Sequence, residues 1–131
     1  MYSYALEVWG GTYAYLIKKI YMQQKRYMRI VHNLKYRDSV ENKFSETKIK
    51  TIYNLYKEKL NTLTYKQLNN ISDYGLTFDE TINQLINTRS KSEMKLKPTS
   101  CKTSFSQRSI KYNSIKFYNE LNQNTKKCVL F

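Results

Sequence analysis

Apolar side chains recur every three or four residues over residues 13–33, which is the pattern of an amphipathic helix. The positions that share one face are Tyr13, Leu16, Ile17, Ile20, Tyr27, Met28 and Val31. We expect this face to pack against the core and Thr12 to cap the helix. The preceding pair, Gly10 and Gly11, is expected to end a short apolar segment, because glycine adopts positive φ at low cost.

A second helical stripe begins near residue 49, after a polar stretch at residues 34–48 that is predicted to be a connector. We expect Ser45 to cap this helix. A stripe of this kind is typical of core packing rather than of a binding site. Its apolar positions are Ile49, Ile52, Tyr53, Tyr56, Leu60 and Leu63.

The helical pattern breaks at residues 69–77, where a turn is expected at Gly75. Asp79 is predicted to cap a short helix that ends near residue 86. Residues 87–104 are polar and basic, hold the only proline, and are expected to be irregular. Apolar spacing typical of a helix returns over residues 105–122.

These elements predict a mainly α fold. We expect a small helical bundle of two long amphipathic helices, with shorter flanking helices and one irregular basic segment. A chain of 131 residues is long enough for one modest core. We therefore assign residues 1–122 to one helical region, with an irregular basic loop at about 87–104, and residues 123–131 to a basic tail that frays.

The charge of the chain points to a polyanionic partner. Lys and Arg number 23 against 10 Asp and Glu, a net charge of +13, and nucleic acid is the commonest partner of so basic a protein. On the helix predicted over residues 13–33, Lys18, Lys25 and Arg29 point in nearly the same direction, with Lys19 and Arg26 beside them. Such a row either tracks phosphates or is only a solvated basic face. Nucleotide bias is a second alternative for the charge, because the chain is rich in Lys, Asn, Ile and Tyr.

Tyrosine is the unusual aromatic residue of this sequence, with 13 copies. Tyrosines that alternate with cations can stack on unpaired bases while the cations hold phosphates. Tyr21, Tyr36 and Tyr112 are the candidates for that role. The tyrosines expected to pack in the core instead are Tyr13, Tyr53 and Tyr56.

Metal and cofactor chemistry has little support. Cys101 and Cys128 stand far apart, and His32 has no partner at zinc spacing, so we expect no metal, no cofactor and no disulfide framework. A Cys101–His32 enzyme is disfavoured, because no base is placed near the thiol. No apolar run is long enough to span a membrane and no signal peptide is visible, so we expect an intracellular location, cytoplasmic or nuclear.

Short phrases in a fixed order cover about nine tenths of the chain. They are ALEVWG at 5–10, QKR at 24–26, RI at 29–30, YRD at 36–38, YK at 65–66, NTR at 87–89, RSIKY at 108–112 and KFYNEL at 116–121. In this order the chain resembles the C-terminal tail of reverse transcriptases from jockey-like non-LTR retrotransposons. It departs from the family pattern at Ile86 and Tyr118, where the family has tyrosine and tryptophan, and at Ser114, where it has glycine.

The family tail lies at and beyond the polymerase thumb, so the resemblance implies a grip on template-primer duplex or element RNA. The palm aspartates that hold two metal ions are missing, because this sequence has no adjacent Asp pair. We therefore expect a truncated fragment without enzyme activity of its own. It is expected to bind RNA or DNA backbone weakly and to take no small-molecule substrate. The candidate contacts are Lys18, Lys25, Arg26, Arg29, Arg89, Lys102, Arg108 and Lys111.

Two alternatives stay open. The last four residues, Cys128 to Phe131, spell a prenylation box after two lysines, which would make the chain a membrane-peripheral basic protein. The second alternative is that the chain is a translated remnant without function.

Overall fold

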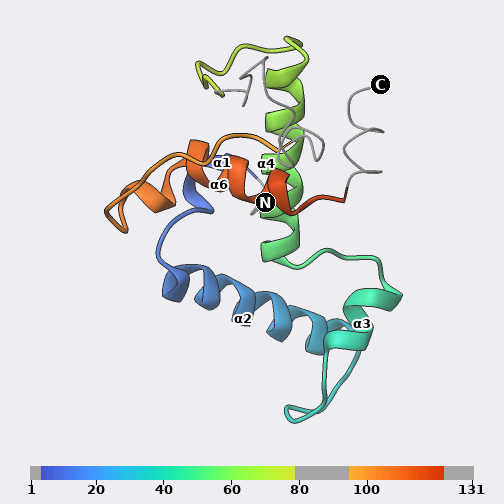
Figure 1. The fold of residues 1–131 in the computed structure, drawn as a ribbon. Helices are drawn as coiled ribbons and strands as arrows, with labels where there is room; N and C mark the ends of the chain where they lie inside the picture. The colour runs from blue at the N-terminus through green and yellow to red at the C-terminus, as the bar shows by residue number, and fades with distance from the viewer. Residues whose placement is uncertain (1–3, 79–94, 123–131) are drawn as a thin grey trace. The chain divides into compact units, whose positions relative to one another are not determined.

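The computed structural model describes residues 4–78 and 95–122 (Figure 1). These residues are mainly helical and contain no strand, which confirms the predicted fold class. The chain divides into two compact units, residues 1–57 and 58–131, whose boundary falls inside the second long helix. The elements are α1 (Leu6–Trp9), α2 (Ala14–Val31), α3 (Glu41–Glu46), α4 (Ile52–Leu68), the 3-10 helix η1 (Ser106–Arg108) and α6 (Ile110–Glu120).

The long basic helix predicted over residues 13–33 is confirmed as α2. Its N-cap is Tyr13, which forms no side-chain cap, so the prediction that Thr12 caps the helix is wrong. At the other end Asn33 has a φ of 50°, and the Leu34 N–H donates to the Arg29 carbonyl at 2.9 Å. Asparagine tolerates this left-handed conformation, so it ends the helix as a glycine commonly does.

The buried side of α2 differs from the predicted face. Only Ile17 and Met28 are buried, and they lie on one side because they are three helical turns apart. The prediction fails because periodicity marks an apolar side of a helix, whereas the packing partner decides which part of that side is covered. The predicted core positions that are exposed are Tyr13 (53%), Leu16 (38%), Tyr27 (63%) and Val31 (52%).

The core of the first unit joins α2 to α3. Met28 packs in one cluster with Val40 and Phe44. The ring of Tyr21 stacks on Phe44 with centroids 6.5 Å apart and meets Tyr53 edge-on at 5.3 Å. The stretch at residues 34–48 is therefore more than a connector, because it contains α3 and supplies two of the three residues in this cluster.

The side chain of Gln24 attaches α2 to the start of α4. Its Nε2 donates to the Lys50 carbonyl at 2.9 Å, and its Oε1 accepts from the Ile52 N–H at 3.1 Å. The first N–H groups of a helix lack internal partners, so Gln24 caps α4 from a distant part of the chain. The predicted cap, Ser45, lies inside α3 instead, and the hydroxyl of Thr51 accepts from a backbone N–H in the first turn of α4.

Part of the apolar stripe predicted for α4 is buried. Ile52, Tyr56 and Leu60 are in the core, whereas Ile49 and Tyr53 are exposed. The buried positions follow one another at four-residue intervals along one side of α4, so α4 buries a narrower face than the pattern predicts.

Gly10 is required for space. It is the C-cap of α1, so the predicted end of the short apolar segment is confirmed, but its φ is −66°, so the expected positive φ is wrong. A methyl group at this position would overlap the ring of Tyr56 and the Leu6 carbonyl. Tyr56 and Leu6 are both buried, so the missing side chain of Gly10 lets α1 lie directly on α4 within the first unit. The glycine with positive φ among the described residues is Gly75, at 65°, where a turn is predicted.

The second unit has its own core around α6. Leu96, Ile115 and Tyr118 are buried together, with Leu68, Phe78 and Leu121 partly buried against them. Ser109 caps α6, because its hydroxyl accepts from the Tyr112 N–H at 3.3 Å. Tyr118 is 3% exposed and so belongs to the core.

One amide side chain attaches an extended segment to α6. Asn119 accepts from the Leu96 N–H and donates to the Leu96 carbonyl, both at 2.9 Å. The described part of the basic segment, residues 95–104, is irregular, as predicted. The helix that Asp79 is expected to cap, Arg89, and the tail that holds Cys128 lie outside the described residues.

Candidate nucleic-acid interface

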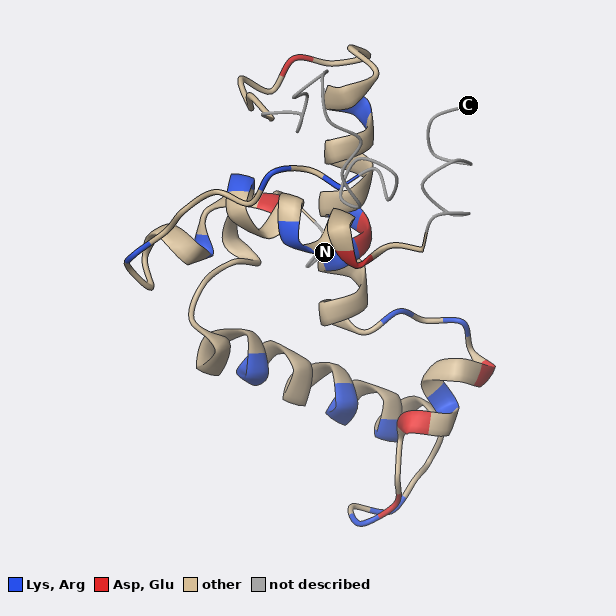
Figure 2. Cartoon of the chain, in the orientation of Figure 1, with Lys and Arg blue, Asp and Glu red and all other residues tan. Residues whose placement is uncertain are grey.

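Helix α2 carries five of the eleven Lys and Arg residues of the first unit. This helix holds five Lys or Arg residues and no acidic residue (Figure 2). Because the helix is long and straight, these cations follow one another along its length at the rise of 1.5 Å per residue. The helix is therefore a row of positive charge that no carboxylate of its own neutralises.

The outward cations of α2 are Lys18, Lys19 and Arg26, which are exposed. Their ammonium and guanidinium groups are free to approach a phosphate without a large desolvation cost. Lys18 and Arg26 are two of the predicted contacts, and the structure places both where a polyanion could reach them.

Lys25 and Arg29 lie closer to the core than the sequence predicts. The Lys25 Nζ is 3.9 Å from Glu41 Oε1 and 4.7 Å from the centroid of the Tyr21 ring. The Arg29 guanidinium lies 5.8 Å from the ring centroid of Tyr36. Both cations thus have partners inside the first unit, because the buried side of α2 is rotated towards them. Their attraction for an external phosphate is reduced accordingly.

The remaining candidates belong to the second unit. Lys102 is exposed in the irregular segment, and Arg108 is half-buried at the end of η1. The Lys111 Nζ lies 3.4 Å from the Thr77 hydroxyl and is half-buried. These three cations are less densely spaced in the chain than those of α2, and Arg89 is outside the described residues.

The exposed tyrosines of α2 are a feature that the sequence alone assigned to the core or left out. Tyr15 is 60% exposed, its ring lies 5.8 Å from that of Tyr13, and the Lys19 Nζ is 6.0 Å above its centroid. By contrast, Tyr21 is enclosed by neighbouring rings and is a poor stacking surface. The spacing of Tyr15, Lys19 and Arg26 at four and seven residues could have revealed this face.

The other predicted stacking residues differ from one another. Tyr36 is 89% exposed, whereas Tyr112 is half-buried on α6. Tyr36 therefore remains a surface on which a base can stack, next to the cation of Arg29.

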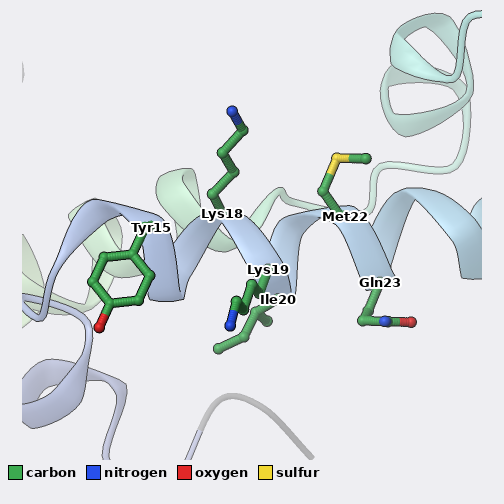
Figure 3. A pocket seen from close by; sticks show the side chains of 6 residues that line it. All are labelled: Tyr15, Lys18, Lys19, Ile20, Met22 and Gln23. Carbon is green, nitrogen blue, oxygen red and sulfur yellow. The ribbon is translucent and has the colours of Figure 1, made fainter.

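An open hollow of about 490 Å³ lies along the middle of α2. Figure 3 shows Lys18 and Met22 extending to one side of the helix and Lys19 and Ile20 to the other. The hollow is lined by Tyr15, Lys18, Lys19, Ile20, Met22 and Gln23. Its lining combines cations with apolar side chains and carries no carboxylate.

Two kinds of feature are absent from residues 4–78 and 95–122. No three His, Cys, Asp or Glu side chains there gather closely enough to hold a metal ion. No helix in that part of the chain has the length and apolar character needed to cross a bilayer.

The sequence matches no protein-family model and no curated protein, and the structure matches no solved structure.

Proposed function

We propose that this chain is a truncated piece, similar to the C-terminal tail of a non-LTR retrotransposon reverse transcriptase, that binds RNA or DNA through the basic side of α2. The observation that carries the proposal is the helix itself, which has five cations, no acid and three exposed cations, Lys18, Lys19 and Arg26. The order of the sequence phrases supports the family, and the charge supports the partner.

The binding is electrostatic in this mechanism. Cations that neutralise phosphates release condensed counterions, so affinity falls steeply as salt rises. Contacts to phosphate position a protein but carry no sequence information, so the chain binds nucleic acids of different sequence alike. Exposed rings such as Tyr15 and Tyr36 add stacking where bases are unpaired. A nucleic-acid partner places the protein in the cytoplasm or nucleus.

The proposal includes no polymerase activity for this chain alone. The sequence holds no adjacent Asp pair, and the acids Asp38 and Asp73 stand in loops far apart in the chain. Two metal ions in a polymerase need carboxylates that converge. Primer extension with purified protein, Mg²⁺ or Mn²⁺ and a primed RNA template is the test. Extension above a mock preparation would refute this part of the proposal.

The binding test compares two charge reversals of equal size. Lys18→Glu with Arg26→Glu changes the exposed row of α2, and Lys35→Glu with Lys48→Glu changes exposed lysines elsewhere in the first unit. We expect the α2 pair to weaken binding to all sequences about tenfold or more, and the control pair to weaken it far less. Wild-type affinity should fall with a log–log salt slope of about −3 to −5, the value for four to six neutralised phosphates.

The result that contradicts the proposal is equal loss in the two pairs, because binding would then follow net charge rather than the α2 row. Affinity that does not change at several hundred millimolar salt would also contradict it.

A further inference from the structure

One side of α2 carries a mainly apolar strip in which four of the five residues are exposed and Ile20 is half-buried. The strip, named here the α2 strip, consists of Leu16, Ile20, Gln23, Tyr27 and Ile30. These positions are spaced by four, three, four and three residues, and the side chains of Tyr27 and Ile30 are 63% and 67% exposed. It is about 21 Å long at 1.5 Å per residue. A contiguous exposed strip of this kind marks an interaction site more often than an ordinary surface.

The spacing of the residues along the strip indicates which kind of partner fits it. An alternation of four and three residues has the 3.5-residue period of a seam between two packed helices. The hollow on α2 includes Lys19, Ile20 and Gln23 from this seam (Figure 3). Together with Leu16 these residues occupy the four positions that surround one inserted side chain in such a pair. The α2 strip thus has the residue spacing of a seam between two packed helices.

The positive charge beside the strip indicates that the partner helix is acidic. Lys19 and Arg26 each directly precede an apolar strip position, which places them at the border where paired helices exchange ion pairs. Both are exposed, and α2 has no acidic residue. A partner with Glu or Asp at its own border positions would meet these cations. We propose that the α2 strip docks an acidic amphipathic helix of another protein.

A second copy of this chain is a poor occupant. In an antiparallel pair the border cations of one copy face those of the other, and like charges repel. In a parallel pair they face the opposite border, where Ile17 is buried and Gln24 is bonded to the start of α4. Neither arrangement supplies an opposite charge.

Lipid and nucleic acid fit the strip less well. Gln23 stands at its centre, where an amide can bond to a partner side chain but would lose water without compensation in lipid. Phosphates would satisfy Lys19 and Arg26 but would leave Leu16 and Ile30 uncovered. An acidic helix accounts for both the apolar and the charged positions.

The experiment uses the full chain and a labelled three-heptad peptide with Leu at the seam and Glu at both borders. Self-repulsion keeps this peptide unfolded alone, so a gain of helical circular dichroism on mixing reports docking, and fluorescence anisotropy reports affinity. We expect saturable binding of the wild type. Leu16→Ser with Ile30→Ser should weaken it at least tenfold. Both residues are exposed, and an unchanged thermal melt would show that the variant folds.

The second part of the experiment reverses the charges at the border of the strip and in the peptide. Lys19→Glu with Arg26→Glu should weaken binding of the Glu peptide about tenfold. The same variant should bind a peptide that has Lys instead of Glu at the borders. Lys35→Glu with Lys48→Glu, which lies off the strip, should do neither. RNA binding separates this inference from the proposed function, because Leu16→Ser with Ile30→Ser should leave RNA affinity within about twofold.

Four outcomes would overturn the inference. Absence of saturable peptide binding up to about 100 µM is one. Binding that Leu16→Ser with Ile30→Ser does not weaken is another, since it would be charge attraction alone. The third is dimerisation of the wild type that this variant abolishes. The last is binding to vesicles with anionic lipid that this variant abolishes while the peptide fails to bind.

Discussion

Helices α2 and α6 are both amphipathic, but they use their apolar residues in opposite ways. Two of the 18 residues of α2 are buried, Ile17 and Met28, whereas α6 buries Ser114, Ile115 and Tyr118 within 11 residues. Helix α2 has no side-chain cap, while α6 has one at Ser109. The longer helix is therefore a surface element whose charged and apolar faces are largely exposed, and the shorter helix is a core element. Length and periodicity alone do not separate these roles.

The largest expected effect contrasts one tyrosine from each helix. Tyr118→Ala removes a ring that is 3% exposed in the second core, and we expect a loss of about 3–4 kcal/mol in the free energy of unfolding. Tyr27→Ala removes a ring that is 63% exposed, and the change should stay within about 0.5 kcal/mol. Urea unfolding followed by circular dichroism measures both. Similar losses would show that α2 is buried in solution.

A smaller effect tests the amide side chain by which each helix holds a distant segment. Gln24→Ala and Asn119→Ala should each cost about 1–3 kcal/mol, because each leaves backbone groups of another segment without their partner. Gln23→Ala, on the exposed side of α2, is the matched control and should cost little. The urea midpoint gives the ranking. A loss for Asn119→Ala alone would mean that α2 is not attached to the start of α4 through Gln24.

Removal of a buried hydroxyl should stabilise α6. Ser114 is fully buried, and its Oγ has no hydrogen-bond partner among the described residues. Ser114→Ala should therefore raise the free energy of unfolding by about 1 kcal/mol, since alanine also favours the helix. A thermal melt that falls instead would indicate a partner for this hydroxyl beyond the described residues.

The substitution with the smallest expected effect, Asn33→Gly, lies at the end of α2. Asn33 is left-handed with a φ of 50°, so Asn33→Gly should be stabilising by a few tenths of a kcal/mol. Asn33→Val should destabilise by about 1 kcal/mol or more, because a β-branched residue is strained there. Differential scanning calorimetry resolves the order of the three proteins. An unchanged midpoint for the valine variant would show that α2 ends elsewhere in solution.

Local sequence patterns were sufficient for the elements. The helix over residues 13–33, the turn at Gly75 and the C-terminal helix follow from periodicity and from residues with particular backbone preferences, which act over a few positions. The same patterns missed α3, because six residues with one buried side chain, Phe44, carry too little periodic signal.

The identity of the basic helix was likewise available from the sequence, since charge and spacing are properties of the chain itself. Which of its cations are outward was not available. Lys25 and Arg29 have partners inside the first unit because Glu41 and Tyr36 lie beside them in the fold. Exposure depends on what packs against a helix, and that partner comes from elsewhere in the chain.

The sequence by itself determined the helical class, the position of the long basic helix and the net charge of +13. Tertiary structure decided that Gly10 makes room for Tyr56, that Gln24 caps a distant helix, and that the α2 strip is open. The reason is physical. Secondary structure follows from interactions between neighbours in the chain, whereas burial and capping by remote side chains arise only when separate segments meet in space.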